Sequence, residues 1–108
     1  MEDAMIKHVV MWKLKDFAEG CGKQENALKI KTMLEGLRDK IKEISYLEVG
    51  VNINDSSMAF DAVLISEFED EHELEIYKKH PEHVKVADFV ARVREGRAVV
   101  DYRMAENR

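Results

Sequence analysis

Residues 77–83 read Tyr-Lys-Lys-His-Pro-Glu-His, and they contain the only proline of the chain and two of its four histidines. The residue before a proline is driven out of helical geometry, and proline itself fits the first turn of a helix. The segment therefore predicts that one helix ends at His80 and that another begins at Pro81. Joints between elements often carry functional side chains, so Tyr77, His80 and His83 are candidate functional residues.

The segments on either side of this joint have the features of helices. Asp70 and Glu73 have the spacing of a capping box, which predicts the start of the first helix. The second helix is expected to close near Gly96, and three arginines around its end would favour the helix dipole: Arg92, Arg94 and Arg97. The apolar stripe predicted for this helix consists of Val84, Ala87, Val90 and Ala91.

Four other segments alternate between apolar and polar residues, as half-buried strands do, and they are residues 6–15, 46–54, 60–68 and 98–104. One face of the first strand is expected to hold Ile6, His8, Val10, Trp12 and Leu14. The third strand has apolar residues on both faces of its middle, which predicts a central place in the sheet. A short turn joins it to the second strand, so these two strands are expected to pair antiparallel.

Two further segments lie between the first and second predicted strands. Apolar residues recur at helical spacing there and predict one amphipathic helix over residues 24–43. The preceding residues 16–22 contain two glycines and no periodicity, which favours a loop. Cys21 is the only cysteine of the chain and is expected to be a free thiol in this loop, consistent with a reducing compartment.

The predicted element order is β-α-β-β-α-β, which is the ferredoxin-like α+β arrangement. It gives a four-stranded antiparallel sheet with its helices on one face, in a single domain over residues 1–108 with a core at about 5–104. The open face would be apolar, and monomers in solution rarely expose a large apolar patch. The chain is therefore expected to form a homodimer that stacks two open faces around a partly hollow centre.

The composition restricts the classes of partner. The chain has 22 acidic and 17 basic residues and a net charge of −5, whereas nucleic-acid binding needs a basic surface. No apolar run approaches the roughly 18 residues of a membrane span. The acidic first five residues lack the basic start of a signal peptide. A cytoplasmic location is expected, with no nucleic-acid or membrane partner.

Three segments, in this order, resemble the stress responsive A/B barrel (Dabb) family. They are Ile6-Lys7-His8-Val9-Val10, the joint Tyr77-Lys78-Lys79-His80-Pro81-Glu82-His83-Val84, and Val100-Asp101-Tyr102. The resemblance covers residues 5–104 and implies a dimeric α+β barrel, in agreement with the predicted fold. Many members of the family are small stress-associated proteins of unknown biochemistry.

One plant member of the family, olivetolic acid cyclase, closes a polyketide without a metal or an organic cofactor. By this resemblance, the catalytic base of the cyclase corresponds to His83 and its carbonyl-orienting tyrosine corresponds to Tyr77. The histidine in the first strand of the cyclase corresponds to His8. This chain departs from the cyclase next to the motif, where it has Lys85, Val86 and Ala87. The matching histidine and tyrosine alone therefore do not establish a cyclase.

The chemistry of these residue types supports two hypotheses. In the first, the chain is a stress-response homodimer whose pocket binds a small, partly apolar ligand through His8, Tyr77, His80 and His83. In the second, it is a cofactor-independent polyketide cyclase or lyase. A histidine has a pKa suited to a general base, and a buried tyrosine hydroxyl can stabilise an enolate. His83 would be the base and Tyr77 the carbonyl partner.

Structural roles are the alternatives for the same residues. Tyr77 would then be a core aromatic with a satisfied hydroxyl, and His83 would orient the joint by bonding to the backbone. His80 and His83, with His8 as a distant third ligand, form only a weak metal motif, so no metal is expected. A cofactor-free oxygenase rests on analogy of fold alone.

Overall fold

The computed structural model describes residues 4–105. Its strands are β1 (Ile6–Leu14), β2 (Phe17–Ala18), β3 (Cys21–Gly22), β4 (Tyr46–Val51), β5 (Ala62–Phe68) and β6 (Arg94–Arg103). Its helices are α1 (Lys23–Glu35), the 3-10 helix η1 (Gly36–Asp39), α2 (Glu71–Lys79) and α3 (Pro81–Val93). No helix within this part of the chain has the length and apolar content to cross a bilayer.

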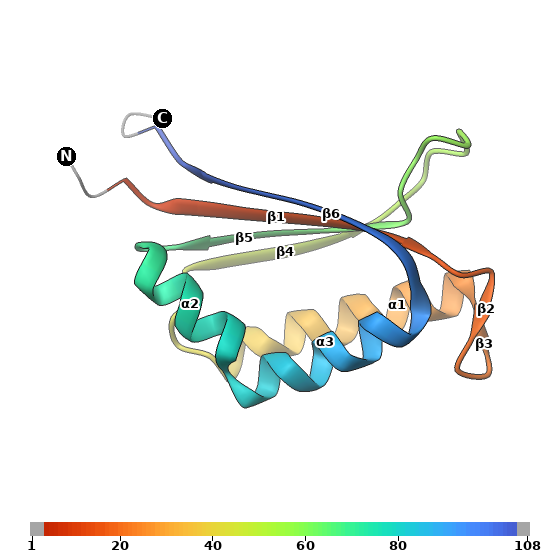
Figure 1. Cartoon of the computed structure of the whole chain (residues 1–108), viewed down its shortest axis with the longest axis horizontal. Coiled ribbons are helices and arrows are strands. Elements are labelled where there is room, and N and C mark those ends of the chain that lie inside the picture. Colours follow the sequence, from red (N-terminus) through yellow and green to blue (C-terminus); the bar gives the residue numbers. More distant parts are fainter. Residues whose placement is uncertain (1–3, 106–108) are drawn as a thin grey trace.

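Four strands form one antiparallel sheet in the order β4-β5-β1-β6, and the three α-helices lie against one of its faces (Figure 1). This is the predicted ferredoxin-like arrangement. The predicted central place of the third long strand is confirmed, because β5 lies between β4 and β1 and is antiparallel to both.

The buried core lies between the sheet and the helices, and β1 shows how the sequence builds it. Its alternate apolar residues all face the helices and are at most 6% exposed: Ile6, Val10, Trp12 and Leu14. His8 occupies the same row and is buried too. The strand register pairs His8 with Ser66 of β5 on one side and with Asp101 of β6 on the other. The alternation of β1 thus carries one polar side chain into an apolar row.

The joint between α2 and α3 is formed as predicted. The Asp70 side chain accepts a hydrogen bond from the Glu73 backbone N–H at 2.8 Å and begins α2. His80 is extended, with φ −62° and ψ 134°, and ends this helix. Pro81 is the first residue of α3, and the His80 ring accepts a hydrogen bond from the Glu82 N–H at 3.1 Å. His80 therefore caps the second helix as well as closing the first.

Several elements differ from the predicted ones. The helix expected over residues 24–43 ends at Glu35, because the chain tightens from Gly36 into η1, consistent with the low helix propensity of glycine. The strand expected over residues 46–54 ends at Val51, and Ile53 is fully exposed. Residues 16–22 hold the hairpin β2–β3, turned at Glu19 and Gly20, which have φ angles of 52° and 77°. Cys21 is a free thiol within β3.

The second helix of the joint also differs from the prediction. It ends at Val93 and not near Gly96, because β6 begins at Arg94 and Gly96 already pairs with Lys13. Only Arg92 of the three arginines lies in its last turn. The buried stripe consists of Val86, Val90 and Val93, whereas Val84, Ala87 and Ala91 are exposed. The helix has apolar residues on more than one side, and its packing after Pro81 selects which of them are buried.

The second face of the sheet carries no helix (Figure 1). The strand register assigns to it a patch of apolar side chains, which we call the open face: Val9, Met11, Val63, Ile65, Ala98, Val100 and Tyr102. Met11, Val100 and Tyr102 are 38%, 54% and 47% exposed in the single chain. A patch of this kind on a small protein typically marks an interface.

Candidate functional site

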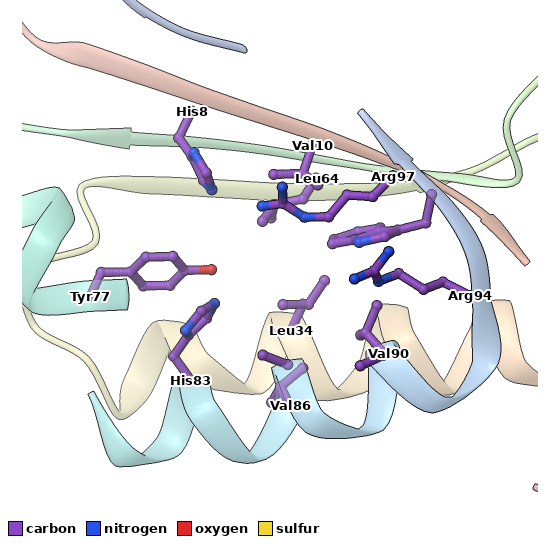
Figure 2. Close-up of a pocket in the computed structure, with 13 residues that line it drawn as sticks. His8, Val10, Leu34, Leu64, Tyr77, His83, Val86, Val90, Arg94 and Arg97 are labelled. Atoms are coloured by element: carbon purple, nitrogen blue, oxygen red, sulfur yellow. The ribbon is translucent and has the colours of Figure 1, made fainter. Parts of the chain in front are cut away.

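A cavity of about 130 Å³ lies between the helical face of the sheet and α2 and α3. Its walls are mostly apolar and come from β1, α1, β5 and α3: Val10, Trp12, Leu34, Leu64, Val86, Ala87, Val90 and Ala91. Five polar residues complete the lining: His8, Tyr77, His83, Arg94 and Arg97. Figure 2 shows these polar side chains converging from different elements on one space. An apolar cavity with a few convergent polar groups is typical of a small-molecule site.

Tyr77 enters the cavity from α2, and its hydroxyl lies between the His8 and His83 rings (Figure 2). The side chain is fully buried, and its ring packs on Phe68 with centroids 4.9 Å apart. The hydroxyl has no hydrogen-bond partner within residues 4–105. Burial raises the pKa of the Tyr77 hydroxyl far above its ordinary value. The group therefore stays protonated at neutral pH and is a donor without an acceptor.

His83 lies next to Tyr77, with ring centroids 4.4 Å apart. Its Nδ1 is 3.0 Å from the Lys78 carbonyl oxygen, which can only accept, so Nδ1 carries the proton. The Nε2 atom of the neutral ring is then left as an acceptor. Burial lowers the pKa of His83, although the Lys78 carbonyl acts in the opposite direction. The imidazole is therefore neutral at pH 7, as a general base must be before it takes a proton.

His8 is the second imidazole of the site, and its ring centroid is 6.1 Å from that of Tyr77. Its Nδ1 is 2.5 Å from Oδ1 of Asp101, its register partner on β6. The carboxylate fixes the ring orientation and the tautomer, which again leaves Nε2 without the proton. Burial lowers the pKa of His8, and the bond to Asp101 offsets part of this shift.

The structure brings together three of the four residues that the sequence analysis selected. Tyr77 and His83 stand six positions apart in the sequence, and the break at Pro81 turns their helices so that the side chains meet. His80 does not line the cavity, because its ring is engaged in capping α3. The bond between His83 and the Lys78 carbonyl, one of the structural alternatives, is present as well. It leaves the ring in the cavity lining.

Sequence reasoning missed three polar residues of the site. Asp101 was noted only as part of a motif, and its register opposite His8 was the signal that could have selected it. Arg94 and Arg97 were placed at a helix end and lie instead in the cavity lining. Within residues 4–105, no group of three histidine, cysteine or carboxylate side chains is arranged to hold a metal ion.

Comparison with known proteins agrees with this fold over nearly the whole chain. The family described as Stress responsive A/B Barrel Domain matches residues 6–104. A dimeric protein of unknown function and ferredoxin-like fold from Bacteroides fragilis is 34% identical, with a TM-score of 0.80 over 93% of this chain and 96% of that one. Among curated proteins, none matches the sequence.

Two more distant structures show the same fold. A dimeric ferredoxin-like protein of unknown function from Thermobifida fusca is 17% identical, with a TM-score of 0.82 over 96% of this chain and 94% of that one. The hydroxynitrile lyase from Passiflora edulis is 16% identical, with a TM-score of 0.81 over 97% of each chain. At these identities the likeness is one of fold alone.

The two neutral histidines predict how stability depends on pH. The pKa values of His8 and His83 are lowered in the folded chain. In the unfolded chain both imidazoles have the ordinary pKa of about 6.5. Below about pH 6.5 the unfolded chain therefore binds more protons, and the free energy of unfolding falls as the pH falls. Urea unfolding at about pH 7.5 and about pH 5.5 measures this slope, which should be smaller in His83→Gln. An equal slope in the variant would contradict the prediction.

The unpartnered Tyr77 hydroxyl predicts an unusual effect of its removal. A buried polar group without a partner costs about 1–3 kcal/mol, so Tyr77→Phe should raise the free energy of unfolding by about 1 kcal/mol. Tyr46→Phe is the control, since its hydroxyl is exposed and bonds to Glu48 at 2.9 Å. Denaturant midpoints measure both variants, and a clear loss of stability in Tyr77→Phe would show that the hydroxyl is satisfied in solution.

Proposed function

The chain belongs to the family of stress responsive A/B barrel domains, and from this premise we propose that it is a homodimeric, cofactor-independent acid–base enzyme of the lyase or cyclase type. Its substrate is a small, partly apolar carbonyl compound. His83 removes a proton next to the carbonyl group, and Tyr77 holds the carbonyl oxygen. The observation that carries this proposal is the unpartnered Tyr77 hydroxyl between two imidazoles in a cavity.

The energetics of that hydroxyl favour binding over a purely structural role. A phenylalanine would fill the same space against Phe68 without burying an unsatisfied donor. A ligand with a carbonyl oxygen between the two rings would supply the missing acceptor. The cost present in the free protein would then be recovered when the ligand binds.

The proposed reaction follows from the protonation states of the side chains. The carbonyl oxygen of the substrate accepts a hydrogen bond from the Tyr77 O–H, which polarises the carbonyl. The neutral His83 takes a proton from the adjacent carbon through Nε2, and the electron pair moves into an enolate. The Tyr77 hydroxyl donates to the enolate oxygen in a mostly apolar site, where such a bond stabilises charge more than it does in water. Because its pKa is raised, Tyr77 donates this bond without losing its proton.

The second imidazole has a distinct part in this proposal. His8 is held by Asp101, as the base of a catalytic triad is held by its carboxylate. It lies on the sheet side of Tyr77, whereas His83 lies on the helix side (Figure 2). His83, which carries the proton on Nε2 after the first step, returns it to the product, and we assign to His8 the role of a second acceptor that orients the substrate through its unprotonated Nε2.

The size of the cavity limits the substrate. A cavity of about 150 Å³ encloses a molecule of the size of benzene, and the cavity here is about 130 Å³. It encloses the reacting end of a carbonyl compound and not a whole folded polyketide. A short substrate, as in a lyase reaction, therefore fits this cavity better than the long substrate of a polyketide cyclase.

The homodimer is proposed from the open face. Its exposed apolar residues would be covered by the same face of a second copy, which is how a two-fold interface forms. The Bacteroides fragilis protein, 34% identical to this chain, is described as dimeric. The cavity lies on the opposite side of the sheet, so stacking of the open faces leaves it intact.

Exchange of carbon-bound protons tests the proposed chemistry without knowledge of the substrate. NMR can follow small ketones and diketones in D₂O. The protons next to the carbonyl should exchange faster in the presence of the wild type than without protein. His83→Gln should lower the catalysed rate by about 10²-fold or more, and Tyr77→Phe should lower it while the fold is retained. His72→Gln is the control, because His72 is exposed on α2 and outside the cavity. Equal rates in His83→Gln and the wild type would refute the assigned base.

Sedimentation equilibrium tests the homodimer. At micromolar concentration the wild type should have a mass of about 25 kDa, which is twice the chain mass of 12.5 kDa. Val100→Asp places a charge on the open face and should give the single-chain mass. Val84→Asp is the matched control, because Val84 is similarly exposed but lies on α3. A wild-type mass near 12.5 kDa would contradict the proposed dimer.

A further inference from the structure

Two arginines at the start of β6 line the cavity on the side away from Tyr77. In Figure 2, Tyr77 enters from the left, whereas Arg94 and Arg97 reach in from the right, with apolar residues between them. The cavity therefore has a neutral acid–base end and a cationic end. The proposed proton transfer uses only the first of these.

A local irregularity of the sheet brings both arginines to the same face. Trp12 pairs with Arg97 and Leu14 pairs with Arg94, so a step of two residues along β1 matches a step of three along β6. In a regular strand, residues three apart point to opposite faces. The register shift between Lys13 and Leu14 is a β-bulge, which changes the direction of the side chains beside it and is common near functional sites.

Both guanidinium groups lack a protein partner within residues 4–105. The other arginines in this part of the chain all have one. Arg38 donates to the Leu47 carbonyl, Arg92 pairs with Glu19, and Arg103 pairs with Glu71. Among the described residues, neither Arg94 nor Arg97 forms an ion pair or a side-chain hydrogen bond. Within residues 4–105, the two arginines that lack such a partner are thus the two that line the cavity.

Unpaired arginines in a cavity are suited to a planar anion. A guanidinium group presents two parallel N–H donors that match the two oxygens of a carboxylate. A carboxylate at this end would also relieve the repulsion between the two cations. Arg97 is one of the groups whose charge lowers the pKa values of His8 and His83, so it lies within electrostatic range of the acid–base end.

We propose that Arg94 and Arg97 select a substrate with a carboxylate, so that the ligand class of this cavity is a short oxo-carboxylate. The carboxylate binds the two guanidinium groups, the short carbon chain lies against Val86 and Val90, and the carbonyl oxygen accepts from Tyr77. The inference rests on the proposed function for the carbonyl end of the ligand. The two arginines determine specificity and take no part in the proton transfer.

A matched pair of ligands tests the selection. Levulinate is a short ketone with a carboxylate, and levulinamide is its neutral counterpart of nearly the same shape. Calorimetry or NMR titration should show that the wild type binds levulinate at least about tenfold more tightly. The double variant Arg94→Gln with Arg97→Gln should remove this preference, because it weakens the binding of levulinate far more than that of levulinamide. Arg97→Lys should retain part of the preference for levulinate, because the positive charge remains but the two parallel N–H donors of the guanidinium group are lost.

Arg92→Gln is the control variant, because Arg92 precedes the pair and points to Glu19 outside the cavity. It should keep the wild-type preference. Equal affinity of the wild type for the two ligands, or no measurable binding of either, overturns the inference. A double variant that keeps the preference overturns it too. Dissociation of the dimer in the double variant without a change in preference would show that the arginines serve an interface instead.

The proposed function has a separate readout. Proton exchange in neutral ketones needs His83 and Tyr77 as the reacting groups, so the double variant should still exchange them, with a pH dependence shifted upward because the charge of Arg97 no longer lowers the pKa of His83. Exchange without a preference for levulinate would support the enzyme and refute the selection. A preference for levulinate without exchange in any ketone would support the selection and refute the enzyme.

Discussion

The break between α2 and α3 is the constraint on which the site depends. Without Pro81, Tyr77 and His83 would project from one straight helix on different sides. With it, their rings are 4.4 Å apart, and His80 closes one helix and caps the next. The same break sets which side of α3 is buried, and therefore which side chains form the cavity wall.

Burial then sets the chemistry of the groups that meet there. It raises the pKa of the Tyr77 hydroxyl and lowers the pKa values of His8 and His83, so all three are neutral at pH 7. Neutral donors and acceptors can be held in an apolar cavity at modest cost, whereas a charge needs a partner or contact with solvent, and at the other end of the cavity Arg94 is partly exposed and Arg97 is exposed. Asp101, the carboxylate paired with His8, has a partly exposed side chain.

The fold followed from the sequence because local signals were strong. Alternation defined the long strands, and the capping box and Pro81 defined the joint. Tyr77, His83 and His8 followed from residue types and the family resemblance. What could not be predicted depends on packing between distant elements. The pairing of β1 with β6 places Asp101 next to His8, α3 buries Val86 in place of Val84, and the bulge at Glu95 reorients Arg94. None of these has a local signature in the sequence.

The bulge in β6 also fixes the sign of the charge at the cationic end of the cavity. Gly96 opposes Lys13, so a regular strand would place Glu95 opposite Leu14 and turn its carboxylate inward. The extra residue leaves Glu95 exposed and lets Arg94 take that position. A shift of one residue at the start of β6 therefore replaces an acidic side chain with a basic one at this position, while Asp101 remains paired with His8. The sign of the charge at this end of the cavity therefore depends on the register of one strand, whereas Tyr77, His8 and His83 stay where they are.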